Sequence, residues 1–161
     1  MKILGVDPGF GRMGYGIILG EGMTTTHIRA GCIETAKTLP HAERLHALYK
    51  ELTRIIEEEK PDLLATEELF FSKNAKTALK VAETRGIIIL LSQIHAIPFV
   101  ELKPLEIKVA TCGYGNADKK QMQYMVTQLL RLPAIPKPDD AADALAIALT
   151  AAATAKTKHT A

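Results

Sequence analysis

Four acidic residues lie in three separate stretches of the sequence, each at the boundary of an apolar element. Asp7 follows the run KILGV, Glu67 follows DLLAT, and Asp140 and Asp143 begin an alanine-rich run. Carboxylates at the ends of buried elements repel one another unless a cation lies between them, and oxygen ligands suit a hard divalent ion such as Mg²⁺. Two such ions about 4 Å apart can activate a water and stabilise the leaving oxygen of a phosphodiester. The pattern therefore predicts metal-dependent phosphoryl hydrolysis.

Two of these stretches contain an additional acid, so the residues alone leave the choice of ligand open. Glu67 and Glu68 end the same strand, and because neighbouring strand residues point to opposite faces, only one of them can face the site. Asp140 and Asp143 share a helical face, but Asp139 precedes Asp143 by one helical turn and could be a ligand or the N-cap. Acids in a first helical turn also stabilise the helix dipole, so the cluster has a purely structural explanation as well.

The elements that must position these acids are predicted from the apolar periodicity. We expect strands over residues 2–7, 14–20, 24–34, 62–67 and 97–102, and helices over 41–60, 74–95, 104–111, 118–130 and 140 to about 153. A β-meander followed by βαβ crossovers gives an α/β fold, with a five-stranded mixed sheet and helices on both faces. Asp7 then lies at the carboxyl end of a central strand, where such folds bind their ligands.

Length and composition predict one domain. The chain has 161 residues, and we expect a single domain over residues 1–154 with a disordered tail over 155–161. The start of the chain fits neither a secretory signal nor a membrane span, and the two cysteines form no metal or disulfide motif, which predicts a cytoplasmic protein. The second half of the helix over residues 74–95 is apolar on nearly all sides, so it is either buried or forms a homodimer interface.

Basic charge is concentrated in the middle of the chain. Residues 71–137 contain 10 basic and 4 acidic side chains, net +6, whereas residues 1–70 contain 8 basic and 11 acidic, net −3. An excess of this kind neutralises phosphates in nucleic-acid binding, although it also fits solvated helix faces.

Four blocks of the sequence, in order and spacing, resemble the RuvC Holliday junction resolvase family. The blocks are GVDPGFGRMGYG, ATEELFFSKNAKTALKVAETRG, GYGNADKKQMQYMV and DDAADALAIA, and the resemblance extends over residues 1 to about 150. It implies the RNase H-like fold, a homodimer, and Mg²⁺-dependent nicking of four-way junctions at two symmetric points. The family's acids fall on Asp7, Glu67, Asp140 and Asp143, and some members have His at the position of Asp140.

The resemblance also implies residues that bind DNA. Either Phe70 or Phe71 is expected to stack on an unpaired base, and either ring could instead pack in the core. The lysines expected to contact phosphates are Lys73, Lys76, Lys80, Lys108 and Lys119. The family's partners are the RuvA and RuvB branch-migration proteins, two Mg²⁺ ions are expected per site, and Mn²⁺ is a possible substitute.

Three other functions are compatible with part of this pattern. A nuclease for RNA–DNA hybrids would share the acids but not the four blocks. A junction-binding scaffold would keep the fold with an inert site, which the complete acid set disfavours. An actin-like kinase also begins with an apolar strand, Asp and a Gly turn, but it needs a second phosphate loop and a much longer chain.

Overall fold

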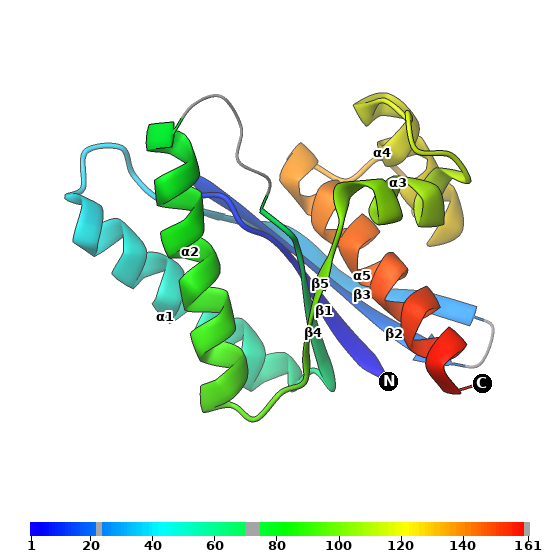
Figure 1. Cartoon of the computed structure of the whole chain (residues 1–161), viewed down its shortest axis with the longest axis horizontal. Coiled ribbons are helices and arrows are strands. Elements are labelled where there is room, and N and C mark those ends of the chain that lie inside the picture. The colour runs from blue at the N-terminus through cyan, green and yellow to red at the C-terminus, as the bar shows by residue number, and fades with distance from the viewer. Residues whose placement is uncertain (22–23, 70–74, 160–161) are drawn as a thin grey trace.

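The strands and helices follow one another in the expected order, βββαβαβααα (Figure 1). The computed structural model describes residues 1–21, 24–69 and 75–159, and side chains for 1–20, 24–69 and 78–155. The strands are β1 (Lys2–Asp7), β2 (Arg12–Glu21), β3 (Thr24–Glu34), β4 (Leu63–Glu67) and β5 (Phe99–Leu102). The helices are α1 (His41–Glu59), α2 (Ala75–Ile94), α3 (Pro104–Cys112), α4 (Lys119–Leu129) and α5 (Asp139–His159).

The five strands form one mixed sheet in the order β3-β2-β1-β4-β5. β1 pairs antiparallel with β2, and β2 with β3, as a meander requires. β1 pairs parallel with β4, and β4 with β5. The helix α1 lies between β3 and β4 in the chain, and α2 forms the crossover from β4 to β5 that a parallel pair requires. β1 is therefore the central strand, which confirms the position expected for Asp7.

Helices cover both faces of the sheet, as predicted (Figure 1). On one face α1 and α2 bury apolar side chains against the strands, among them Leu48, Leu52, Ile88 and Leu91. On the other face α5 lies along the sheet, with α3 and α4 packed against it. Each fully buried aliphatic side chain in these two layers contributes about 1.5–3 kcal/mol to folding.

α5 packs unusually close to the sheet because the residues at the contact are small. A Cβ atom at Gly5 of β1 would collide with the backbone of Ala144 and Ala148, and one at Gly14 of β2 would collide with the carbonyl of Asp140. Ala144 and Ala148 are themselves fully buried at this contact. The helix start is therefore held directly against the strands that end at the predicted site.

α2 has one buried side and one exposed side. Ile88 and Leu91 are fully buried, whereas Leu90 and Ile94 are 54% and 56% exposed. Burial, one of the two alternatives for this apolar stretch, is therefore confirmed for one face of the helix, and the homodimer interface stays a prediction for the other.

α5 is longer than expected, because its backbone is helical through His159 and not only to about Ala153. Residues 155–159 thus belong to the helix and not to the disordered tail expected over 155–161. The expected end of α5 was wrong because it relied on an apolar period, whereas Ala and Lys favour a helix even where no such period is present. Within the described part of the chain, no helix has the length and apolar character needed to cross a membrane.

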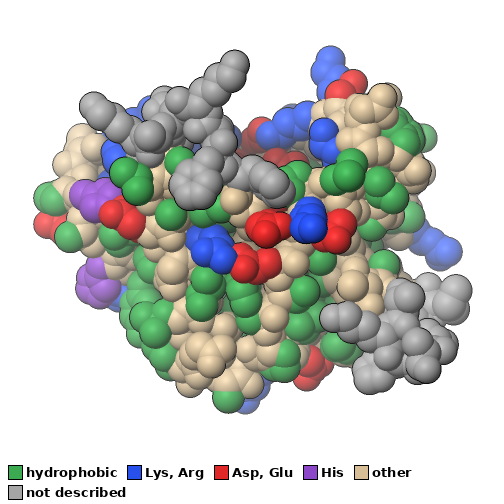
Figure 2. Space-filling model, viewed as in Figure 1, with side chains coloured by type: hydrophobic (Ala, Val, Ile, Leu, Met, Phe, Trp, Pro, Cys, Tyr) green, Lys and Arg blue, Asp and Glu red, His purple; other side chains and the backbone are tan. Residues whose placement is uncertain are grey.

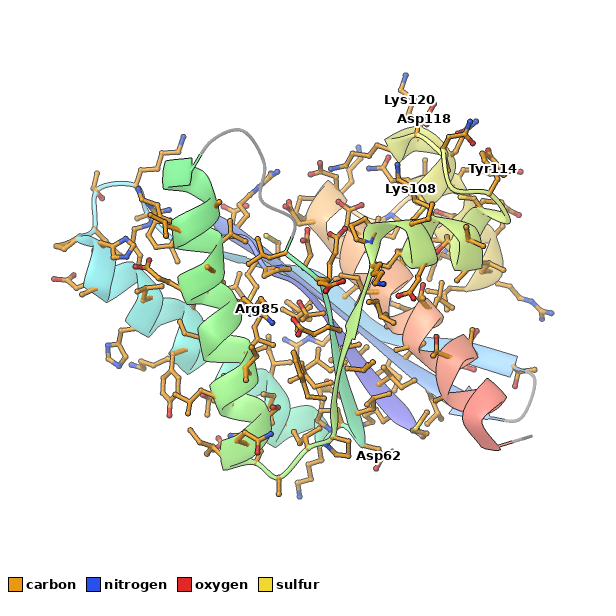
Figure 3. The ribbon with its side chains drawn as sticks, in the orientation of Figure 1. Asp62, Arg85, Lys108, Tyr114, Asp118 and Lys120 are labelled. Carbon is orange, nitrogen blue, oxygen red and sulfur yellow. The ribbon has the colours of Figure 1, made fainter. Side chains whose placement is uncertain are left out.

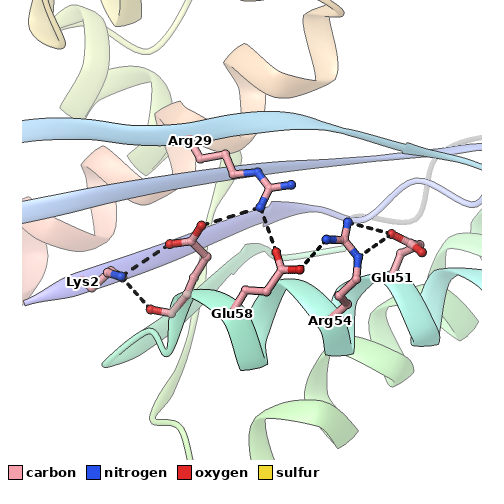
Figure 4. A network of polar contacts seen from close by, with 6 residues as sticks. Lys2, Arg29, Glu51, Arg54 and Glu58 are labelled. Carbon is pink, nitrogen blue, oxygen red and sulfur yellow. Dashed lines mark hydrogen bonds and ion pairs between the residues drawn. The ribbon is translucent and has the colours of Figure 1, made fainter.

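A network of ion pairs fixes the C-terminal half of α1 to the edge of the sheet (Figure 4). Arg29 of β3 contacts Glu58 at 3.0 Å, and Lys2 of β1 donates a hydrogen bond to the Glu59 carbonyl at 2.7 Å. Arg54 continues the network through its pairs with Glu58 and Glu51. This network includes none of the four candidate acids.

Candidate active site

Asp7 and Glu67 lie at the same edge of the sheet because their strands are parallel neighbours. Val6 is the register partner of Thr66, and the Thr66 hydroxyl donates a hydrogen bond to the Val6 carbonyl at 2.9 Å. The carboxyl ends of β1 and β4 therefore meet at the edge where α/β folds place functional groups.

The start of α5 brings the other two acids to this edge. Gly14, against which the Asp140 backbone packs, is the register partner of Asp7. Asp140 and Asp143 lie one helical turn apart, and both raise the pKa of Asp7 through their charges. The structure thus brings the four acids expected from the sequence to one edge of the sheet. Figure 2 shows acidic and basic side chains close together on the face viewed there.

Burial and mutual repulsion disfavour the charged forms of these acids. The pKa of Asp7 is raised to about 7, first by burial and then by the charges of Asp143, Glu67 and Asp140. Burial is also the main reason that the pKa values of Glu67 and Asp143 are raised. A cation stabilises buried carboxylates of this kind, so the site has the electrostatic character of a metal site.

The two glutamates at the end of β4 have different electrostatic partners. Glu67 is coupled electrostatically to Asp143, whereas Glu68 acts on Arg85 of α2. Arg85 in turn makes a two-armed ion pair with Glu101 of β5, with distances of 2.5 and 2.7 Å (Figure 3 labels Arg85). Glu68 thus acts on Arg85 through its charge, and it also lines a small cavity together with Asp7 and Glu67.

Asp139 lies at the rim of the site and binds two cations. Its carboxylate contacts Lys119 Nζ at 2.5 Å and Arg12 Nη2 at 3.2 Å. The same cations reach the neighbouring acids, since Lys119 is 3.2 Å from Asp143 and Arg12 is 3.0 Å from Asp140. The hydrogen bond from Lys119 holds the pKa of Asp139 below its ordinary value.

The donors fit a hard divalent cation, although they do not form a closed cage. Asp140 Oδ2 is buried and receives no hydrogen bond, because the nearby Arg12 approaches it without hydrogen-bond geometry. A buried carboxylate oxygen without a donor is suited to a metal ligand. Within the described ranges, no three His, Cys, Asp or Glu side chains converge closely enough to hold an ion. The fit therefore rests on the chemistry of the four carboxylates and on the Asp140 oxygen, which has an ion pair with Arg12 but no hydrogen bond.

A cavity of about 310 Å³ opens beside the acids, between α3, α4 and α5. Glu67 and Asp143 line it on the acidic side, and Lys108 and Lys119 contribute positive charge. Lys108 lies on α3 and is labelled in Figure 3. Two of the lysines expected to contact DNA thus border the acidic site, and Lys119 also forms ion pairs within it.

The remaining predicted DNA contacts are only partly within the described residues. Lys80 is exposed near the start of α2, with its ammonium 5.3 Å from the centre of the Phe10 ring. Phe70, Phe71 and Lys73 lie outside the described residues, and for Lys76 only the backbone is described.

Sequence reasoning missed one basic group at the site, Arg12, and a second beside the loop that follows β1, Arg44. Arg12 pairs with the acids of α5, and Arg44 of α1 lies over the Phe10 ring at 4.1 Å while donating a hydrogen bond to Thr35. Arg12 lies inside the block GVDPGFGRMGYG, only five positions after Asp7. This closeness in sequence could have indicated that Arg12 lies near the acids. Arg44 is far from the acids in sequence, so only the fold reveals its position.

Comparison with known proteins identifies the family. The family model described as crossover junction endodeoxyribonuclease RuvC matches residues 3–151. The chain belongs to the RuvC family. Membership confirms the resemblance inferred from the four sequence blocks, and it identifies the protein as an endodeoxyribonuclease, an enzyme that hydrolyses DNA phosphodiesters.

Curated relatives and solved structures agree with this assignment. The RuvC of Thermosipho melanesiensis is 49% identical over 148 residues, which cover 92% of this chain and 94% of the relative. The RuvC of Chloroflexus aurantiacus is 50% identical, with coverage of 98% and 96%. The structure of Thermus thermophilus RuvC in complex with Holliday junction substrate superposes with a TM-score of 0.93 at 30% identity, covering 98% and 96% of the two chains. The RNase H-like fold expected from the sequence is confirmed.

Proposed function

We propose that this RuvC-family chain resolves four-way DNA junctions by metal-dependent, paired symmetric nicks during recombination and repair. The observation that supports the proposal is that Asp7, Glu67, Asp140 and Asp143 lie at one edge of the sheet and act on one another through their charges. The relative from Thermus thermophilus is solved with a Holliday junction substrate, and we extend that substrate to this chain. The expected products carry 5′-phosphate and 3′-hydroxyl ends.

The four acids would hold two Mg²⁺ ions, and Mn²⁺ should substitute because it accepts the same oxygen ligands. Ions held in this way supply an activated water and stabilise the leaving oxygen. Asp7 must lose its proton before it can act as a ligand, and its pKa of about 7 makes this step sensitive to neutral pH. Activity limited by metal binding should therefore rise as the pH increases through about 7.

The protein's own cations would orient the substrate. Lys108 lies at the cavity beside Glu67, and its charge partly offsets the rise in the pKa of that acid. Lys119 reaches the same cavity from the start of α4. Positive groups next to an acidic site contact the DNA backbone and reduce its repulsion from the carboxylates. We assign Lys108 and Lys119 this role.

The solvent face of α2 supports a homodimer. Leu79, Leu90 and Ile94 are 64%, 54% and 56% exposed, and their spacing places them on one face of the helix. Gly86 lies on the same face, and a Cβ atom there would meet nothing within 4 Å. Several large apolar side chains on one exposed face are typical of a partner surface. A two-fold dimer would present two active sites to a junction that has its own two-fold symmetry.

Further contacts to DNA are expected from the segment that joins β4 to α2. Phe70 or Phe71 would stack on an unpaired base at the junction centre, contributing about 1–3 kcal/mol. Lys73, Lys76 and Lys80 would neutralise phosphates. Lys80 is the member of this group whose side chain is described, and its exposure is compatible with the role.

The cellular setting is proposed from the family alone. We place the protein in the cytoplasm, acting with the RuvA and RuvB branch-migration proteins. Co-purification of the chain with RuvA and RuvB on a synthetic junction would test the partnership, and its absence at saturating concentrations of all three proteins would refute it.

The deciding experiment compares a synthetic mobile four-way junction with a linear duplex of matched sequence, each with Mg²⁺ and with EDTA. Paired symmetric nicks confined to the junction and to the samples with metal would support the proposal. Asp7→Asn should retain junction binding and lose cleavage. Cleavage of both substrates would refute junction selectivity, and tight junction binding without nicks under all conditions would indicate a scaffold.

A further inference from the structure

Two protein cations and three aspartates form a continuous chain of ion pairs at the start of α5. Arg12 lies between Asp140 and Asp139, at 3.0 and 3.2 Å, and Lys119 lies between Asp139 and Asp143, at 2.5 and 3.2 Å. Asp140 and Asp143 belong to the acid set, whereas Asp139 does not. Two acids of the metal site are thus already paired with cations of the protein.

Arg12 is the first residue of β2, and its side chain reaches the start of α5. Two residues later Gly14 packs directly beneath the Asp140 backbone, which keeps the start of α5 within reach of the Arg12 side chain. A guanidinium is a planar fork with five donors, so it can contact two carboxylates at once. The Arg12 side chain is 48% exposed and that of Asp140 only 17%, so solvent is available to Arg12 when it leaves the pair.

We propose that Arg12 is an internal counter-cation of the acidic site, which a divalent ion must displace from Asp140, and that Asp139 holds Arg12 after displacement. The inference rests on the proposed metal site. The Arg12 guanidinium lies 3.0 Å from the Asp140 carboxylate. A metal ion bound to the same carboxylate would repel it, because both groups are positively charged. Asp139 keeps its own contact with Arg12 because it is not a ligand.

The arrangement explains why the acids do not form a closed cage. The ion pairs hold Asp140 and Asp143 toward Arg12 and Lys119, and no metal-binding group of three is found in the described part of the chain. Metal affinity is then lower than four carboxylates alone would produce, because each ion must first break a contact within the protein. Removal of Arg12 should therefore strengthen metal binding, which is the opposite of the effect expected for loss of a ligand.

The test is calorimetric titration of the DNA-free protein with MgCl₂, comparing wild type with Arg12→Gln. We expect Arg12→Gln to bind Mg²⁺ roughly fivefold more tightly, the ratio that corresponds to the upper end for a half-exposed ion pair. Arg54→Gln is the matched control, since Arg54 is also 48% exposed and also pairs with two acids, far from the site. Its Mg²⁺ affinity should equal that of wild type.

Two further variants test whether a change in Mg²⁺ affinity comes from the Arg12–Asp140 ion pair, from loss of any nearby positive charge, or from misfolding. Lys108→Gln removes a cation that acts on Glu67 but has no ion pair with any described acid, and it should shift the affinity less than Arg12→Gln. Arg12→Met repeats the comparison with a different neutral side chain, and circular dichroism reports whether each variant is folded.

Equal or weaker Mg²⁺ binding by folded Arg12→Gln and Arg12→Met would overturn the inference while leaving the proposed nuclease intact. So would an equal gain in Lys108→Gln, because charge alone would then account for the effect. Failure of wild type and both Arg12 variants to bind Mg²⁺ or Mn²⁺ at millimolar concentration would overturn the inference and the metal site together.

Discussion

Replacement of Asp7 by Asn should stabilise the metal-free protein at neutral and alkaline pH. Asp7 is deeply buried among three other acids, and its pKa is raised from 3.8 to about 7. The folded state therefore binds the Asp7 proton more tightly than the unfolded state does. This contribution to stability is complete below about pH 4 and is lost as the pH rises through about 7. Asn removes the titration and keeps a similar shape.

The size of the effect follows from the pKa. A rise from 3.8 to about 7 corresponds to an upper limit of about 4 kcal/mol, at about 1.4 kcal/mol per pKa unit. Neighbouring acids also titrate and share the repulsion, so we expect Asp7→Asn to be more stable than wild type by about 1–3 kcal/mol at pH 8. Below pH 4 the difference should be close to zero.

Urea unfolding in EDTA, measured from pH 4 to pH 8 for both proteins, tests this reasoning. The wild-type free energy of unfolding should decrease over that range more steeply than that of Asp7→Asn. Glu57→Gln, at an exposed position of α1, is the control and should follow wild type. Equal stability of wild type and Asp7→Asn at pH 8 would show that folding does not raise the pKa of Asp7. Addition of Mg²⁺ should then stabilise wild type more than Asp7→Asn, because only wild type has the complete acid set.

Further predictions follow from the packing. Gly14→Ala places a Cβ atom against the Asp140 carbonyl, so it should cost about 1–3 kcal/mol in urea unfolding; Gly86→Ala, which meets open space within a helix, should be neutral or stabilising. Leu90→Asp on the exposed face of α2 should convert a dimer to a monomer in sedimentation experiments, while Leu105→Asp on α3, at 61% exposure, should not; a dimer that survives Leu90→Asp would exclude this face. Arg85→Gln breaks the two-armed pair with β5 and should lower the free energy of unfolding by about 1 kcal/mol, measured in urea; no change would mean that solvent already screens the pair.

Much of this fold is encoded locally, and the sequence predicts it for that reason. The run before Asp7 is apolar at every position except Lys2 and Gly5, as expected for a central strand covered on both faces. The periodicity of α1 and the proline that follows it define that helix almost to the residue. The end of α5 was misplaced because alanine-rich sequence forms helix without an apolar period.

The chemistry of the site was also predictable in part. Carboxylates at the ends of two strands and in the first turn of a helix predict a cluster, because parallel strands end at the same edge. The structure places all four acids there. The homodimer, the ions and the contacts from residues 70–76 remain predictions, to be tested by the experiments above.

By itself the sequence determined the order of the elements, the acids that could meet and the family to which the chain belongs. Only the tertiary structure showed that Glu67 is coupled to Asp143, that α2 is buried on one side alone, and that Arg12 pairs with Asp140. The physical reason is that strand register, helix rotation and ion-pair partners depend on contacts between residues distant in sequence. Arg12 and Asp140 lie at opposite ends of the chain, and no local pattern relates them until Gly14 allows α5 to pack against β2.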